Sequence, residues 1–174
     1  MSYLLLAYPE LDPADYRLIQ EYRKQNDKLY FNLVEPHFTI VFPVSDIEES
    51  EFLTEVTNKV RGVKKFDFIL RSAVIQKDAF NDYYHAYLVP DEGYSALVKM
   101  HDRFYSGVFK DNLRLDIPFI PHIGIGNSKE SSKCKEMIDE WNGIDFSIRG
   151  VVNKLDLVNY DLDKITNLNH YHLL

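Results

Sequence analysis

PHFTI at residues 36–40 and PHIGI at residues 121–125 are the two stretches on which the interpretation of this chain depends. Each is a short apolar segment led by proline and histidine. A helical pattern follows each one, and then comes a segment with the pattern D-F-x-x-R-x-x-V that begins at Asp67 or Asp145. The order P-H-x-x-I, helix, D-F-x-x-R-x-x-V therefore occurs twice, which indicates an internal repeat.

The repeat predicts how the two histidines lie relative to each other. Lobes related by a pseudo-twofold axis bring equivalent residues toward that axis, so we expect His37 and His122 to face each other across a shared cleft. Successive strand residues point to opposite sides, so Thr39 should share the face of His37, and Gly124 that of His122. In the alternative interpretation, the histidines only fill equivalent structural positions.

Two facing histidines favour chemistry at phosphorus. In-line displacement needs a proton acceptor on the entering side and a proton donor on the leaving side. Imidazole suits both tasks because its ordinary pKa is about 6.5. The hydroxyl of Thr39 can donate a hydrogen bond to a non-bridging phosphate oxygen, where charge accumulates. This scheme predicts His37, Thr39 and His122 as catalytic residues and requires no metal.

The remaining motifs have plainer interpretations. The chain has one cysteine, Cys134, and no H-x-x-x-H helix, so a metal site is not expected. His170 and His172 share a strand face and could chelate a metal, which leaves a metallohydrolase as a weaker alternative. We expect His101 to be structural. Arg71 and Arg149 are expected to be exposed or to form structural ion pairs. The tyrosines of the segment near residue 85 are expected to pack in the core or to stack on a base: Tyr83, Tyr84 and Tyr87.

Periodicity and turn signals predict an α+β fold with largely antiparallel sheets. Strands are expected near residues 3–8, 36–43, 66–76, 83–89, 121–126, 146–158 and 169–174. Helices are expected at residues 12–26, from a capping box at Ser45 and Glu48 to about Arg61, at residues 92–105, and after a start at Asn127 with Glu130 three residues later. No linker is evident, so residues 1–174 are predicted to be one domain.

Composition limits the class of partner. The net charge is −7, which argues against a broad basic face for long nucleic acid but permits a small phosphorylated ligand or an RNA end. No stretch is long enough to span a membrane, and the first residues lack the basic flank of a signal peptide. We therefore expect a cytoplasmic protein without a membrane partner.

At its two histidine motifs the sequence resembles the two-histidine (2H) phosphoesterase superfamily, which includes bacterial 2′-5′ RNA ligase-like proteins and cyclic nucleotide phosphodiesterases. The family carries two H-x-T/S motifs, one in each of two pseudo-symmetric lobes. The resemblance implies a bilobal fold with two sheets lining a central cleft and helices outside. It also implies activity on 2′,3′-cyclic phosphates or 2′-5′ phosphodiester bonds of nucleotides or short RNA ends, without a cofactor.

Gly124 departs from the family pattern, which has Thr or Ser there. A backbone N–H exposed by close approach could replace the missing donor, Ser128 could reach in, or the site could be weakened. Gly124 is accordingly kept as a substrate-binding position. The departure also favours a second hypothesis, a module that binds a nucleotide or RNA end with little turnover. Hydrolysis is preferred to ligation, and the sequence leaves open which histidine is the base.

Overall fold

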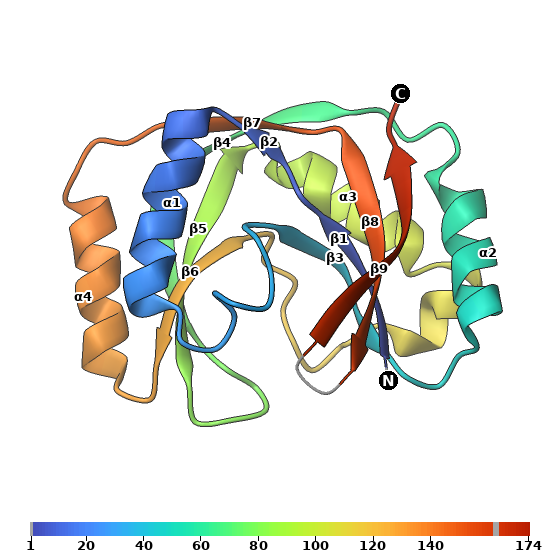
Figure 1. Ribbon diagram of the computed structural model, residues 1–174, viewed down its shortest axis with the longest axis horizontal. Coiled ribbons are helices and arrows are strands. Elements are labelled where there is room, and N and C mark those ends of the chain that lie inside the picture. The colour runs from blue at the N-terminus through green and yellow to red at the C-terminus, as the bar shows by residue number, and fades with distance from the viewer. Residues whose placement is uncertain (1, 162–163) are drawn as a thin grey trace.

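Two antiparallel sheets form the framework of the computed structural model, which describes residues 2–161 and 164–174 (Figure 1). The four-stranded sheet has the order β3 (Phe38–Val44), β1 (Ser2–Ala7), β8 (Lys154–Asp161) and β9 (Lys164–His172). The five-stranded sheet has the order β2 (Glu10–Leu11), β7 (Ile148–Val152), β4 (Phe66–Lys77), β5 (Tyr84–Glu92) and β6 (Ile123–Ser128). Every strand pair is antiparallel, which confirms the predicted fold class.

The helices pack on the outside of the sheets. Helices α1 (Pro13–Asn26) and α4 (Ser131–Asn142) lie side by side against the five-stranded sheet (Figure 1). Helix α2 (Glu49–Val60) packs on the four-stranded sheet, where the Thr57 hydroxyl is 2.9 Å from that of Tyr171 in β9. Helix α3 (Tyr94–Phe104) contacts β3 and β5, and a 3₁₀ helix spans Gly107–Asn112.

Two predicted helix starts are wrong. The predicted start at Asp12 is confirmed, because its carboxylate accepts the Ala14 N–H. The capping box at Ser45 and Glu48 does not form, because Glu48 itself is the extended residue before the helix and no side chain caps it. Helix α2 consequently begins at Glu49 without a side-chain cap. The start at Asn127 is also wrong, because that residue belongs to β6.

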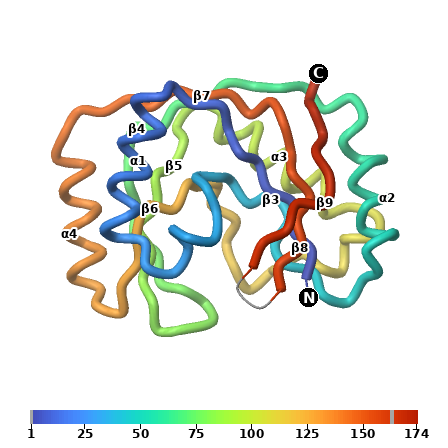
Figure 2. The backbone as a smooth tube through the Cα atoms, viewed as in Figure 1, coloured from blue at the N-terminus to red at the C-terminus, as the bar shows by residue number. Residues whose placement is uncertain are grey.

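The lobes do not correspond to the two halves of the chain. The two D-F-x-x-R-x-x-V segments are neighbours in one sheet, where Ile69 of β4 pairs with Arg149 of β7. The C-terminal strands β8 and β9 instead complete the sheet that contains β1, so that β1 from the start of the chain lies beside β8 from near its end (Figure 2). Each sheet is therefore built from both ends of the sequence, and neither can form alone from a contiguous half.

An aromatic contact links the two sheets. Phe38 of β3 and Phe68 of β4 are fully buried and meet edge to face, with ring centroids 5.0 Å apart. Gly150 of β7 makes room for this contact: a Cβ atom there would lie 2.5 Å from Cζ of Phe68 and 2.7 Å from Cδ2 of Leu11. The segment that follows His37 is thus fixed to the opposite lobe through the core.

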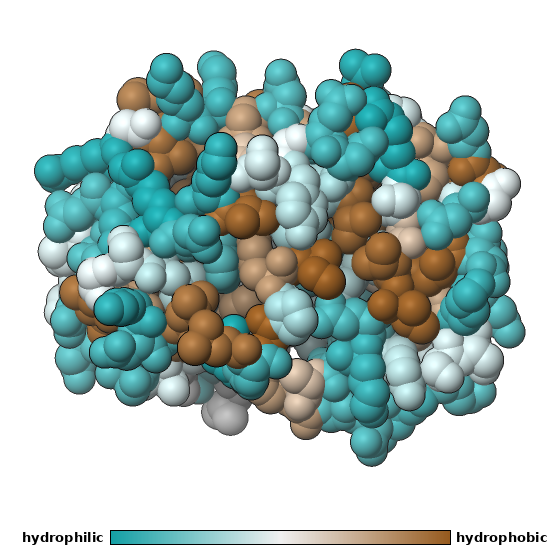
Figure 3. Space-filling view, turned by 180° about the vertical axis from the view of Figure 1, so that it is seen from behind, coloured by the Kyte–Doolittle hydropathy of each residue, from teal (hydrophilic) through white to brown (hydrophobic). Residues whose placement is uncertain are grey.

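The surface is mixed in character. Figure 3, seen from behind Figure 1, shows small apolar groups within a largely hydrophilic face. Among the described residues, no helix is both long and apolar enough to cross a membrane.

The space at Gly150 gives a stability prediction. Gly150→Ala places a methyl group against a buried ring, so we expect the free energy of unfolding to fall by about 1–3 kcal/mol. Gly124→Ala is the matched control, because a Cβ atom at that strand glycine meets nothing within 4 Å. Urea unfolding of both variants measures the difference. An equal loss of unfolding free energy in the two variants would contradict the explanation that Gly150 makes room for the Phe68 ring.

Candidate active site

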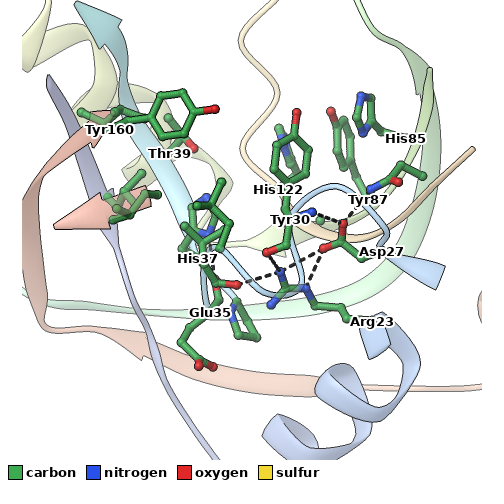
Figure 4. A pocket seen from close by; sticks show the side chains of 18 of the residues that line it. Arg23, Asp27, Tyr30, Glu35, His37, Thr39, His85, Tyr87, His122 and Tyr160 are labelled. Atoms are coloured by element: carbon green, nitrogen blue, oxygen red, sulfur yellow. Dashed lines mark hydrogen bonds and ion pairs between the residues drawn. The ribbon is translucent and has the colours of Figure 1, made fainter. Parts of the chain in front are cut away.

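The four residues predicted from sequence line one cavity of about 330 Å³ between the two sheets. His37 and Thr39 approach it from the start of β3, and His122 and Gly124 from the start of β6. Figure 4 shows His37 and Thr39 on one side and His122 on the other. The fold therefore brings together residues that are 85 positions apart in the sequence, although their roles stay predictions.

Both imidazoles are held in the same way. Nδ1 of His37 lies 2.7 Å from the carbonyl oxygen of Glu35, and Nδ1 of His122 lies 2.6 Å from that of Ile120. A carbonyl oxygen only accepts, so each Nδ1 carries the hydrogen and each neutral ring presents a lone pair at Nε2. Within residues 2–161 and 164–174, neither Nε2 has a hydrogen-bond partner.

Burial keeps both rings uncharged. It lowers the pKa of His37 to about 4, and a hydrogen bond to the backbone at Glu35 only partly opposes this effect. Burial also lowers the pKa of His122 to about 4, and the neighbouring imidazoles of His37 and His85 lower it further. At neutral pH each Nε2 is therefore a proton acceptor, and one ring can become a proton donor when an anion enters the cavity.

Aromatic rings orient the two histidines differently. Tyr8 meets His37 edge to face, with ring centroids 5.8 Å apart. Tyr87 stacks on His122 at 3.6 Å, and His85 lies parallel to Tyr87 at 5.6 Å. Tyr87 thus lines the cavity, whereas Tyr84 packs against the core.

The structure removes one of the three interpretations of Gly124. The space around Gly124 is open, so a ligand can still approach the backbone there. Ser128 does not reach the site: it lies outside the cavity lining, and its hydroxyl accepts the Glu130 N–H at 3.1 Å. The missing hydroxyl therefore leaves room beside His122 for a larger residue.

A β-bulge brings an unpredicted residue into the site. Tyr87 pairs with Gly124 and Ala86 with Gly126, so Ile125 is the extra residue in β6. The bulge turns Asn127 toward the face of Gly124, and Asn127 lines the cavity. The glycines on both sides of Ile125 were the available signal, because glycine inside a strand often marks a bulge.

Sequence reasoning also missed the buried ion pair of α1. Arg23 is 2% exposed, although arginine side chains are seldom fully buried unless they are paired. Its guanidinium donates to Asp27 at 2.9 and 3.1 Å and to the carbonyl oxygen of Val34 at 2.8 Å. Arg23 and Asp27 both line the cavity, and the bond from Arg23 to Val34 holds the segment that leads to His37. The i, i+4 spacing of opposite charges was the available signal.

The other predicted residues lie outside the cavity lining. Arg71 forms ion pairs with Asp91 and Glu92, and His101 is buried with Nδ1 2.9 Å from the carbonyl oxygen of Ile40, so both structural predictions are confirmed. His170 is exposed and pairs with Asp156 of β8. Among the described residues, no three His, Cys, Asp or Glu side chains are placed to hold a metal ion.

The protein thus has an α+β fold in which two antiparallel sheets each direct one histidine into a shared cavity. A model of the 2′-5′ RNA ligase superfamily matches residues 9–164, so the chain belongs to this family of 2H phosphoesterases. A Bacillus licheniformis protein, provisionally named a phosphoesterase, is 23% identical over 166 residues, which cover 94% of this chain and 92% of that protein.

Solved structures show the same fold. The Thermus thermophilus protein TT0787 superposes with a TM-score of 0.64 at 15% identity, covering 99% of this chain and 98% of that one. Escherichia coli LigT in its apo form gives 0.62 at 14% identity, covering 99% and 96%. LigT has also been solved with 3′-AMP, and that structure matches with a TM-score of 0.56 at 15% identity, covering 99% and 98%.

The environment of the two rings predicts their titration. We expect NMR chemical shifts of the imidazole protons of His37 and His122 to report pKa values below 5 in the free protein. Because these folded-state values lie below the unfolded value of about 6.5, the two groups make the fold less stable as pH falls from 6.5 toward 4. A midpoint at pH 6 or above for either ring would contradict the assigned burial.

Proposed function

We propose that this protein is a metal-independent phosphoesterase that acts on 2′,3′-cyclic phosphates or 2′-5′ phosphodiester bonds of nucleotides or short RNA ends. The observation that carries the proposal is the matched anchoring of His37 and His122, which leaves two open Nε2 atoms in one cavity. Membership of the family supports the reaction class. The nucleotide bound by the related LigT supports the class of ligand.

The proposed reaction uses one histidine on each side of the phosphorus. One neutral Nε2 takes a proton from the attacking water, the new P–O bond forms, and the opposite bond breaks. The other ring gives its proton to the departing oxygen, so it must be protonated before the step. A bound phosphodiester anion favours that protonation by raising the low pKa of the ring. The Thr39 hydroxyl donates to a non-bridging oxygen.

The same geometry serves both directions of the reaction. Hydrolysis is preferred to ligation because water is the ubiquitous nucleophile. Reversal exchanges the acid and the base, so we assign these roles to the pair rather than to one histidine each.

Loss of either histidine tests the catalytic assignment. We expect His37→Ala and His122→Ala each to lower turnover of a 2′,3′-cyclic nucleotide by roughly 10²–10⁴, the range for general acid–base groups. The assay contains a chelator, and circular dichroism checks that the variants fold. His172→Ala, at an exposed position outside the cavity lining, is the control. A loss below tenfold in both cavity variants, or turnover abolished by the chelator, argues against the proposal.

Gly124 supports a second candidate function. Losing one hydrogen-bond donor to the transition state typically costs about 2.7–4 kcal/mol, a hundred- to a thousand-fold in rate. A protein with that loss could serve as a module that binds a nucleotide or RNA end. Binding of a cyclic nucleotide by the natural protein without product formation would favour the module.

Restoring the family residue separates the two functions. We expect Gly124→Thr to fold, because the space beside Gly124 is open, and to raise turnover by up to about a hundredfold. Gly124→Val has a similar shape without the hydroxyl and is the matched control. Equal rates in the two variants would show that a hydroxyl at this position contributes nothing.

A further inference from the structure

Asn127 has a buried polar atom without a partner. The residue is 2% exposed, and its amide lies 2.6 Å from the Asp27 carboxylate. That carboxylate only accepts, so the amide nitrogen must face it, which fixes Oδ1 on the other side. Oδ1 has no hydrogen-bond partner among the described residues. An unpaired buried acceptor is unfavourable, and a ligand donor would remove the penalty.

His85 presents a second open atom. Its ring is 4% exposed, and Nε2 lies 2.8 Å from Oδ2 of Asp78. Because Asp78 accepts the Nε2 hydrogen, the tautomer of the uncharged imidazole that fits this contact has its lone pair at Nδ1. This atom also lacks a hydrogen-bond partner in the described part of the chain. His85 and Asn127 are cross-strand partners in β5 and β6, so the two acceptors are neighbours.

The two acceptors lie close to the proposed reaction centre. The ring of Tyr87 lies between the rings of His122 and His85. Its centroid is 3.6 Å from that of His122 and 5.6 Å from that of His85. Figure 4 shows His85 and Tyr87 side by side on the side of the cavity that carries His122. The separation between the rings of His122 and His85 is therefore within the length of one nucleoside. The whole cavity has the volume for one small ligand.

The local charges favour a donor group in this part of the cavity. The cation of Arg23 is already paired with Asp27, and the Asp78 carboxylate lies beside His85. Hydrogen bonds from the N–H of Phe80 and from His85 lower the pKa of Asp78 despite its partial burial, so it is ionised at neutral pH. A second phosphate here would meet the negative charge of Asp78 and the two acceptors, whereas the hydroxyls of Tyr30 and Tyr87, which also line the cavity, can serve as donors or as acceptors.

We propose that His85 and Asn127 form a specificity subsite that binds the exocyclic amino group of a cytosine or adenine base. This inference rests on the proposed function, because it places the base beside the phosphorus subsite. An amino group has two hydrogens for two acceptors, whereas uracil and hypoxanthine carry a carbonyl oxygen at the equivalent position. The protein then selects cytidine over uridine and adenosine over inosine.

Paired nucleotides test the subsite. Calorimetry measures binding of 3′-CMP against 3′-UMP and of 3′-AMP against 3′-IMP, and an assay measures turnover of the corresponding 2′,3′-cyclic forms. We expect the amino-bearing member of each pair to bind about tenfold to a hundredfold more tightly, since the other member leaves the buried Oδ1 of Asn127 unpaired. Equal affinity within both pairs, or preference for the carbonyl member, overturns the inference.

Two variants show whether these side chains cause the preference. His85→Phe keeps a ring beside Tyr87, and Asp78 retains the backbone donors of Phe80 and Asn81. Asn127→Leu removes the acceptor, and Asp27 retains the N–H of Tyr30. We expect each variant to reduce the cytidine-to-uridine preference to below about threefold, mainly by weakening cytidine binding. His172→Phe is the matched control and should leave the preference unchanged.

The outcomes separate this inference from the proposed function. Turnover of cyclic nucleotides without base preference retains the phosphoesterase and overturns the subsite. Base preference in binding without any turnover retains the subsite and overturns the phosphoesterase. A preference that persists in both His85→Phe and Asn127→Leu overturns the assignment to these residues.

Discussion

The contact between Phe38 and Phe68 is the constraint on which the site depends. These rings join the strand after His37 to the core of the other sheet, with centroids 5.0 Å apart. Because Phe38 points into the core, its neighbours His37 and Thr39 point to the opposite side, into the cavity. The position of the first histidine is therefore set by hydrophobic packing, and the same packing holds the two sheets on either side of the cavity.

The cavity joins two environments that differ in hydrogen bonding. Near His37 and His122, each imidazole is fixed through Nδ1 and open at Nε2, as proton transfer requires. Near the other end of the cavity, the side chains of His85 and Asn127 are held by the carboxylates of Asp78 and Asp27, which leaves one acceptor atom of each open. The Arg23–Asp27 pair belongs to both, since it fixes the segment before His37 and orients Asn127. One buried charge pair thus connects the proposed chemistry with the proposed selectivity.

Much of the fold could be predicted because its signals are local. The proline-led strands at residues 36–40 and 121–125, the Asp12 cap and the apolar stripe of α4 each depend on neighbours within a few positions. The capping box at Ser45 was wrong because the helix begins three residues later than the pattern suggested, with Glu48 still extended and no side-chain cap. Asn127 was missed as a site residue because one bulge reverses which strand residues face the cavity.

The sequence by itself determined the two histidine motifs, the antiparallel α+β class and the family, because residue type and spacing carry this information. Tertiary structure alone decided that β4 and β7 share one sheet, that Arg23 is buried, and that His85, Tyr87 and Asn127 join the cavity. These features depend on contacts between residues up to about a hundred positions apart, such as Asp27 with Asn127. Local sequence patterns do not encode such contacts, because they arise only when the two sheets pack together.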